Sequence, residues 1–386
     1  MKRLVAALLA ISLTVFAISA YADVNIPEAD EEVSADVELS CMSAVLMDSS
    51  SGRILYSKGE DYYNSPASVT KVMTLLLVME ALERGEFSLS DEVMISEYAS
   101  SMGGSQVFLK AGERMTVEEL IKCTVIASAN DAAVALAELV SGSEAAFVKR
   151  MNEKAKELGL KKTSFENSTG LDDDTVEHYS CASDIAIMSR ELIKHELITE
   201  YSSLWQDSIR NGEFILTNTN RLVRFYDGCN GLKTGSTDKA GYCITVSAKR
   251  GDTELIAVIM NAPSLKERNS DARALLDYGF YGYAPYSFSG EDIPELSVSR
   301  GTQNKVRVGT DGFSMLLPKS DIKNVTALYE IPECIDSPVV CGEVVGKAIF
   351  KNGDQIIGEC ELYALESVDR ISFFELFSRI MTNIFI

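Results

Sequence analysis

The stretch Asn64-Ser65-Pro66-Ala67-Ser68-Val69-Thr70-Lys71 opens a mostly apolar run that predicts a buried helix ending near Gly85. Pro66 suits the first turn of that helix, where its missing N–H costs nothing. Ser68 and Lys71 are three positions apart, so they share a face of the first turns. A serine hydroxyl is a weak nucleophile at neutral pH, and a lysine kept neutral beside it can take its proton. The stretch therefore predicts a catalytic Ser/Lys pair, although Ser-x-x-Lys alone also occurs by chance.

Two further short motifs carry compatible chemistry. Ser128-x-Asn130 lies between two expected helices, the first of which begins with the capping-box pattern Thr116-Val-Glu-Glu119. The motif is therefore expected in an inter-helix loop. Lys233-Thr234-Gly235 precedes a pattern typical of an antiparallel hairpin, so we expect it on a strand. Each motif alone is a weak signal, because Lys233 could be a surface charge and Asn130 a turn former.

The order of the expected elements indicates an α+β fold in which an antiparallel sheet is flanked by helices. Two apolar runs around a Ser/Gly turn at residues 43–57 predict a β-hairpin, and residues 143–158 and 180–198 predict helices. Residues 241–260 predict a second hairpin, and residues 270–278 a closing helix. Because strands stand at both ends of this region with helices between them, we expect the N- and C-terminal strands to share one sheet.

The chain divides into five predicted segments. They are a signal peptide (1–22), a flexible acidic leader (23–38), the α+β domain (39–290), a small all-β domain (291–365) and an amphipathic helix (366–386). The basic start, the apolar run and Ala20-Tyr21-Ala22 predict export with cleavage after Ala22, with an uncleaved anchor as the alternative. The protein is then expected at the outer face of the cytoplasmic membrane, extracellular or periplasmic. The bulky apolar stripe of the tail favours binding to the membrane surface over docking on the protein body.

Composition narrows the possible partners. The 386 residues carry a formal net charge of −21, which argues against nucleic acid as a partner. The chain has two histidines and no C-x-x-C pair or Cys/His cluster, so we expect no metal site and no cofactor. Most of the eight cysteines are expected to be small core residues. Cys334 and Cys341 flank a loop and could form a disulfide if the protein is exported.

Taken together, the three motifs resemble those of the D-alanyl-D-alanine carboxypeptidases, the low-molecular-mass penicillin-binding proteins. The stretches Gly103-Gly-Ser-Gln, Asn167-Ser-Thr-Gly-Leu and Gly231-Leu-Lys-Thr-Gly-Ser-Thr-Asp-Lys-Ala-Gly are similar to that family as well. The resemblance covers about residues 40–285 closely. It implies a penicillin-binding protein or serine β-lactamase-like domain, and the β domain and the tail match the family's layout more loosely.

The resemblance also implies a catalytic role for three residues. Ser68 would attack the carbonyl between the two D-alanines of a peptidoglycan pentapeptide, and Lys71 would take the hydroxyl proton. Ser128 would relay a proton to the leaving amine. β-Lactam antibiotics would acylate Ser68 as covalent inhibitors, because their ring carbonyl mimics the scissile amide.

The remaining motif residues are implied to bind the substrate. Asn130 would orient Lys71 and the substrate amide. The backbone N–H groups of Ser68 and Ser236 would form an oxyanion hole. Lys233 and Thr234 would bind the terminal carboxylate. Arg268 occupies a position where the family often has an arginine for the same carboxylate. The implied substrate-binding set is Asn130, Lys233, Thr234, Gly235, Ser236 and Arg268.

Some positions depart from the family pattern. Ala129 stands where glycine is also common, and Ser236 stands where other members carry histidine or an aromatic residue. Glu166 precedes Asn167-Ser-Thr-Gly and does not fit a class A β-lactamase loop, and His178 is expected to be a structural hydrogen-bonder. Two alternatives stay open at this point: a β-lactamase or esterase on the same fold, and a non-catalytic cell-wall-binding protein.

Overall fold

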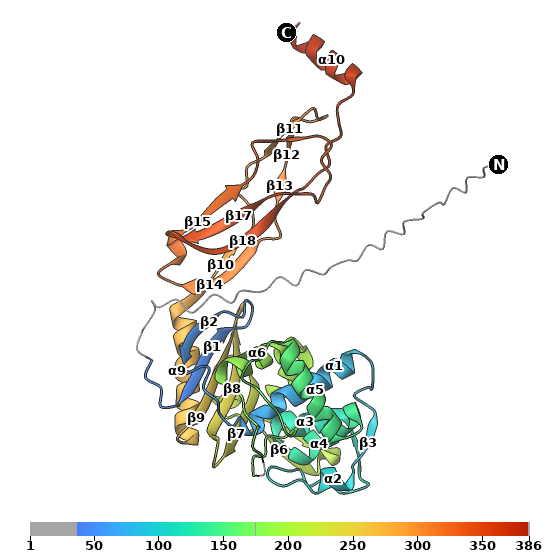
Figure 1. The fold of residues 1–386 in the computed structure, drawn as a ribbon, viewed down its shortest axis with the longest axis vertical. Helices are drawn as coiled ribbons and strands as arrows, with labels where there is room; N and C mark the ends of the chain where they lie inside the picture. The colour runs from blue at the N-terminus through green and yellow to red at the C-terminus, as the bar shows by residue number, and fades with distance from the viewer. Residues whose placement is uncertain (1–36, 174, 385–386) are drawn as a thin grey trace, which may run out of the picture.

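The structure, a computed structural model, describes residues 37–173 and 175–384. The predicted signal peptide and nearly all of the predicted leader lie outside the described residues. Figure 1 shows a larger body of sheet and helices, an elongated β domain that projects from it, and a short helix at the far tip of the β domain.

The body is built on one antiparallel sheet. Its five strands lie in the order β2 (Ile54–Lys58), β1 (Ser43–Asp48), β9 (Thr253–Ala262), β8 (Gly241–Arg250) and β7 (Cys229–Thr237). The hairpin near the N-terminus therefore pairs directly with the hairpin more than two hundred residues later, which confirms the α+β prediction. β7 is an edge strand, so one side of its backbone has no strand partner.

Helices cover both faces of this sheet (Figure 1). α9 (Leu265–Gly282) packs on one face, where Leu275 and Leu276 are fully buried against residues of β1, β8 and β9. The other face carries the helical lobe. That lobe comprises η1 (Ala67–Thr70), α1 (Lys71–Glu83), α2 (Glu97–Ser100), α3 (Val117–Ile126), α4 (Asn130–Ser141), α5 (Glu144–Glu157), α6 (Ala182–Ile193), α7 (Glu196–Ser202) and α8 (Leu222–Phe225). Short pieces β3 (Glu92–Met94), β4 (Arg114–Thr116), β5 (Gln206–Ile209), η2 (Arg210–Gly212) and β6 (Phe214–Thr217) complete it.

The helix predicted from the opening stretch is the centre of the lobe. α1 is buried on all sides over most of its length. It ends at Glu83, two residues before Gly85, which adopts φ +72°. The sequence predicted this burial and this end. The first turn differs from the prediction, because Ala67–Thr70 form a 3-10 turn, with Ala67 at φ +46°, before the α-helix starts at Lys71.

Three other helices show where sequence patterns succeed and fail. The Thr116/Glu119 capping box is present at the start of α3. The single helix predicted over 180–198 is wrong, because α6 ends at Ile193 and α7 starts at Glu196. The closing helix begins at Leu265, earlier than predicted, because Ser264 caps it by accepting a hydrogen bond from the Glu267 N–H.

The β domain begins with β10 (Tyr283–Phe288), which pairs antiparallel with β14 (Phe313–Pro318). A four-stranded sheet follows in the order β13 (Val308–Gly309), β18 (Gln355–Ala364), β17 (Val344–Asn352) and β15 (Val325–Glu330). A smaller sheet joins β12 (Lys305–Val306), β11 (Leu296–Ser299) and β16 (Cys334–Asp336), and η3 spans Ile322–Asn324. The core between them centres on Phe350, which stacks on Phe313 at 4.3 Å.

The tail forms α10 (Phe373–Ile384) at the tip of the β domain (Figure 1). The residues just before the helix pack on the β domain. Val368 is buried and pairs with Val339, and the Ile371 N–H donates to the Arg300 carbonyl. Within the described part of the chain, no helix has the length and apolarity needed to cross a membrane.

The cysteines are all free thiols in the structure. Five of them are buried, as predicted for small core residues. The suggested disulfide between Cys334 and Cys341 is not formed, and both of these side chains are exposed.

Candidate active site

The first element of the site is the Ser68/Lys71 pair. Ser68 lies on the 3-10 turn at the entrance of α1, and Lys71 is the first residue of the α-helix. The Lys71 side chain is completely buried, and its Nζ lies 3.0 Å from Ser68 Oγ. Nζ also donates to Asn130 Oδ1 at 2.6 Å and to the Thr169 carbonyl at 2.7 Å. The predicted hydroxyl and amine are therefore within hydrogen-bond distance of one another.

This arrangement favours a neutral amine. Burial lowers the pKa of Lys71 well below the ordinary lysine value, and the positive charge of Lys233 lowers it further, against a smaller opposing effect of Asp131. A neutral amine has two N–H bonds and one lone pair. The two carbonyl acceptors, Asn130 Oδ1 and the Thr169 carbonyl, can take the two N–H groups. The lone pair is then left for the Ser68 hydroxyl, which is the geometry of a base.

The turn between α3 and α4 supplies the second motif. Ser128 adopts φ +62°, which turns the chain sharply between the two helices. Asn130 is the first residue of α4 and is buried, and its Nδ2 donates to the Gly103 carbonyl at 2.7 Å. The Asn130 N–H donates to the Ser105 carbonyl at 2.7 Å. The 103–105 stretch therefore fixes the amide whose oxygen holds Lys71.

The third motif lies on β7, where the sequence predicted a strand. Lys233 is buried, and its Nζ donates to Ser128 Oγ at 2.8 Å and to the Thr234 carbonyl at 2.8 Å. Burial, assisted by the charge of Arg268, lowers the pKa of Lys233 to about 7. Lys71 is hydrogen-bonded to the hydroxyl of Ser68, and Lys233 to that of Ser128. Each of the two motif serines is therefore paired with a different lysine.

The open edge of β7 packs directly on the nucleophile turn. A Cβ added to Gly235 would lie 2.8 Å from the backbone nitrogen of Ser68 and 2.9 Å from that of Val69. Real Cβ contacts are never so short, so a side chain at this position would push the strand off the turn. Gly235 thus allows the backbone of β7, including Ser236, to approach the N–H of Ser68.

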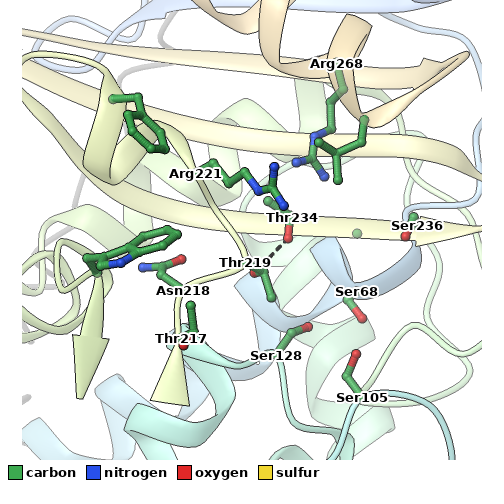
Figure 2. Close-up of a pocket in the computed structure, with 14 residues that line it drawn as sticks. Ser68, Ser105, Ser128, Thr217, Asn218, Thr219, Arg221, Thr234, Ser236 and Arg268 are labelled. Atoms are coloured by element: carbon green, nitrogen blue, oxygen red, sulfur yellow. Dashed lines mark hydrogen bonds between the residues drawn. The ribbon is translucent and has the colours of Figure 1, made fainter. Parts of the chain in front are cut away.

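A cavity of about 660 Å³ opens over these residues (Figure 2). Six of the nine sequence-predicted residues line it: Ser68, Ser128, Thr234, Gly235, Ser236 and Arg268. Lys71, Asn130 and Lys233 lie behind that surface. Lys71 bonds to Ser68 and Lys233 bonds to Ser128, whereas Asn130 is joined to the site through its bond to Lys71. The structure therefore brings all nine together. The other lining residues are Ser105, Trp205, Thr217, Asn218, Thr219, Arg221, Phe225 and Leu265.

Two arginines lie at one end of the cavity. Arg268, in the first turn of α9, is buried, and its guanidinium donates to Asn269 Oδ1. Burial lowers its pKa to about 10, and the nearby Arg221 contributes to that shift. Arg221 was missed from the sequence, because it lies outside the three motifs. Asn218 and Asn220 were the available signals that this segment forms turns.

The 167–171 loop was similar to the family in sequence, but its contacts with the nucleophile turn could not be predicted from that similarity. Asn167 Oδ1 accepts hydrogen bonds from the N–H groups of Thr169 and Gly170, which fixes the loop whose Thr169 carbonyl holds Lys71. A Cβ added to Gly170 would overlap the carbonyl oxygen of Ala67, and Gly170 has φ +84°. The loop is therefore packed backbone to backbone against the nucleophile turn.

His178 has the structural role predicted for it. The Glu166 N–H donates to its Nδ1 at 3.0 Å, so Nε2 carries the proton of the neutral ring and faces Thr70 Oγ1 at 2.8 Å. Burial lowers the pKa of His178 to about 4, which agrees with a neutral ring. The Glu166 carboxylate accepts from the backbone N–H groups of Val176 and Glu177.

Comparison with known families identifies both domains. A family model described as D-alanyl-D-alanine carboxypeptidase matches residues 29–264. A second, described as the C-terminal domain of penicillin-binding protein 5, matches residues 286–370. The first match covers the sheet, the helical lobe and all site residues up to Ser264.

Individual relatives extend over nearly the whole chain. The D-alanyl-D-alanine carboxypeptidase DacF of Bacillus subtilis is 42% identical, over 99% of this chain and 98% of that protein. The structure of penicillin-binding protein 5 from Haemophilus influenzae has a TM-score of 0.75 at 31% identity, covering 86% of this chain and 98% of that one. Penicillin-binding protein D2 from Listeria monocytogenes, in an ampicillin-bound form, has a TM-score of 0.59 at 32% identity and covers 64% of this chain and 99% of that one.

Proposed function

The chain belongs to the D-alanyl-D-alanine carboxypeptidase family and is a serine-type peptidase, and from that premise we propose that Ser68 is its nucleophile and Lys71 its base. Ser68 Oγ forms a bond to the carbonyl carbon of the penultimate D-alanine as its proton moves to Lys71 Nζ. The C–N bond to the terminal D-alanine then breaks, and the leaving amine takes up a proton through Ser128. Water hydrolyses the resulting ester, which frees the shortened peptide and Ser68.

The observation that carries this proposal is the coordination of Lys71. Its two carbonyl partners and the Ser68 hydroxyl use the whole hydrogen-bonding capacity of a neutral amine. A protonated lysine in the same place would be a buried charge with a second ammonium, that of Lys233, nearby. The geometry therefore supports a base that is ready before the substrate arrives.

Lys233 and Ser128 have the matching role at the leaving group. Lys233 Nζ donates to Ser128 Oγ, which leaves the hydroxyl hydrogen of Ser128 free to pass to the departing nitrogen. The close packing of Gly235 on Ser68 supports an oxyanion hole formed by the N–H groups of Ser68 and Ser236. In other enzymes, removal of one such donor costs about 3–4 kcal/mol of transition-state stabilisation.

The cationic end of the cavity suits the free carboxylate of the terminal D-alanine. Thr234, Arg268 and the neighbouring Lys233 are the proposed readers of this group. Charge-assisted hydrogen bonds to a carboxylate are about twice as strong as neutral ones. Such recognition would make the enzyme a carboxypeptidase, since an internal peptide bond offers no carboxylate there.

We also propose that β-lactams acylate Ser68, as the ampicillin-bound and cefotaxime-bound relatives from Listeria suggest. Penicillin has a carbonyl in place of the scissile amide and a carboxylate in place of the terminal one. No Asp or Glu is found among the described residues that line the cavity. A cleaved ring stays tethered, so without a carboxylate to activate water we expect a long-lived adduct.

The proposed place of action is the outer face of the cytoplasmic membrane, and the tail is the proposed point of attachment. The exposed faces of Phe373, Phe374 and Phe377 on α10 support this, because bulky apolar side chains at a chain end would otherwise remain in water. In Figure 1 the helix lies at the opposite end of the β domain from the peptidase body, so the β domain would hold the active site away from the surface.

The nucleophile can be identified by labelling the protein with a radioactive or fluorescent penicillin and mapping the modified peptide by mass. We expect a single adduct on Ser68 that is absent from Ser68→Ala. Ser105→Ala is the matched control, because Ser105 also lines the cavity but no hydrogen bond joins its hydroxyl to an amine in the described structure. An adduct on another residue would refute the assignment, and no adduct at all would favour the non-catalytic alternative.

A further inference from the structure

The segment 218–222 holds a framework that the three motifs do not explain. Asn218 and Asn220 are both almost fully buried. Asn218 Nδ2 donates to the carbonyls of Ser202 and Leu204, and Asn220 Nδ2 donates to the carbonyl of Gly231 at 2.8 Å. Two buried amides thus hold this short stretch of loop against α7 and β7. Such a rigid support suits residues that must keep a fixed position.

The residues carried by this framework face the cavity. Thr219 Oγ1 accepts a hydrogen bond from Thr234 Oγ1 at 2.8 Å, which ties the segment to the third motif. Arg221 follows as the residue that precedes α8 and also lines the cavity. Figure 2 shows its guanidinium and that of Arg268 pointing into the same end of the cavity, beside Thr234.

Arg221 has no partner that explains its position. Its side chain is exposed, and in the described part of the chain no hydrogen bond or ion pair is found for its guanidinium. The positive charge instead faces a second arginine, and their proximity contributes to the lowered pKa of Arg268. Two guanidinium groups and the nearby Lys233 thus lie together in a protein whose formal net charge is −21, with no carboxylate among the described lining residues. An anion between them would relieve this repulsion.

We propose that Arg221 is a specificity-determining residue that binds the terminal carboxylate of the substrate together with Thr234 and Arg268. This inference rests on the carboxypeptidase function proposed above and adds a second guanidinium to the proposed carboxylate-binding residues. Because Arg221 is exposed while Arg268 is buried, Arg221 meets the incoming carboxylate first. Its contribution is to capture of the free-acid substrate, so it acts on KM rather than on the chemical step.

The test compares an N-acylated L-Lys-D-Ala-D-Ala peptide as the free acid with its C-terminal amide. Arg221→Gln should lower kcat/KM for the acid about tenfold, mainly through KM, because a charge-assisted contact is lost. The same variant should change kcat/KM for the amide less than twofold. The decline of kcat/KM with added salt should also be shallower for the variant on the acid, since exposed charges are screened. Arg221→Lys should recover part of the loss.

Arg224→Gln is the matched control. It removes the same charge three positions further along the chain, within α8, but the Arg224 guanidinium lies over the rings of Trp205 and Phe225 instead of facing Arg268. Equal losses on acid and amide for Arg221→Gln, or an equal loss for Arg224→Gln, would overturn the inference. Wild-type release of D-alanine separates this result from the proposed function: if the wild type releases none, the carboxypeptidase proposal itself has failed.

Discussion

At the scale of single residues, the site depends on two lysines that are buried where water cannot stabilise their charged forms. Lys71 and Lys233 are both buried, and the loss of hydration lowers the pKa of each amine. Burying a lysine in this way costs stability, because the unfolded chain would hold the proton that the folded chain gives up. In the proposed mechanism, the same burial favours the neutral amine of Lys71 that serves as the base.

This cost has a pH dependence of fixed sign. The folded pKa of Lys71 lies far below the value of about 10.4 expected for an unfolded lysine. Between these two values the unfolded state binds one more proton, so wild-type stability rises with pH there. Relative to Lys71→Met, the wild type should gain up to about 1.4 kcal/mol per pH unit between pH 7 and pH 10.

The measurement is urea unfolding of both proteins over that pH range. Lys149→Met, at an exposed position of α5, is the control and should show no comparable gain. A difference between wild type and Lys71→Met that is flat from pH 7 to pH 10 would mean that Lys71 keeps its proton in the folded protein.

Glycines form the second residue-scale feature. Gly170→Ala should lower the unfolding free energy by about 1–3 kcal/mol, the usual cost of overpacking, because its Cβ would overlap the Ala67 carbonyl. The rate of penicillin acylation should fall about a hundredfold, since displacement of the turn misplaces Ser68. Stopped-flow labelling and thermal unfolding measure the two effects.

Gly159→Ala separates this overlap from backbone strain. Gly159 has φ +71°, similar to Gly170, but no atom lies within 4 Å of an added Cβ. We expect it to cost about 1 kcal/mol of stability, as for a left-handed L-residue, and to leave acylation unchanged. If Gly170→Ala behaves in the same way, the close packing of the 167–171 loop on the nucleophile turn is not needed for catalysis.

Residue identity in the site could be predicted from the sequence, but its support could not. Ser68, Lys71, Ser128 and Lys233 stand in short motifs whose residue types and spacing indicate the chemistry directly. Arg221, Thr169 and Gly170 act through backbone carbonyls, close approaches and a loop orientation. These contacts depend on how distant segments pack, so the Asn167-Ser-Thr-Gly-Leu stretch resembled the family without revealing what its residues do.

At the scale of elements, the turn between α3 and α4 sets the orientation of the Ser128 side chain. Ser128 occupies a left-handed conformation that costs an L-residue about 1–2 kcal/mol, and its bond to Lys233 is the compensating contact. Ser128→Ala and Ser128→Gly should therefore both slow acylation by about 10²–10⁴-fold, because both lose the hydroxyl.

The two variants should differ in stability alone. Ser128→Gly should be about 1 kcal/mol more stable than Ser128→Ala, because glycine adopts the left-handed conformation without strain. Acylation kinetics and denaturant unfolding of both proteins test this. Acylation within tenfold of wild type in either variant would exclude Ser128 as the proton relay.

The sequence predicted elements where the signal is local and failed where it is not. The hairpin at the N-terminus, the capping box of α3 and the strand of the third motif all follow from short patterns. The continuous helix over 180–198 was wrong, because apolar periodicity runs through Lys194 and His195 although the chain breaks there. The 3-10 turn at Ser68 was also missed, since it depends on packing against β7 and on Gly170.

At the scale of the whole molecule, the peptidase body and α10, the proposed membrane-binding helix, lie at opposite ends of the β domain (Figure 1). Deletion of residues 373–386 should release the protein from membranes and leave the hydrolysis of soluble peptide unchanged. The cut belongs after Ser372, because Val368 and Ile371 contact the β domain. Sedimentation with vesicles measures the effect.

A full-length variant checks that the apolar surface itself is responsible. Phe374→Asp combined with Phe377→Asp keeps the helix length and should weaken vesicle binding at least about a hundredfold, since each buried phenylalanine contributes roughly 2 kcal/mol. Phe374 is 82% exposed, so its loss should not affect folding of the β domain. A truncated protein that still sediments with vesicles would place the anchor elsewhere in the chain.

The central claim is that one acyl-enzyme on Ser68 turns over quickly with a wall peptide and slowly with penicillin. The most direct measurement follows D-alanine release from a free-acid D-Ala-D-Ala peptide and penicillin hydrolysis side by side, in the wild type, Ser68→Ala and Lys71→Ala. We predict many turnovers of peptide, a stoichiometric adduct with slow hydrolysis of penicillin, and neither activity in the variants, because a nucleophile and its base act as a unit. Rapid penicillin hydrolysis without D-alanine release, or release that survives Ser68→Ala, would contradict the account.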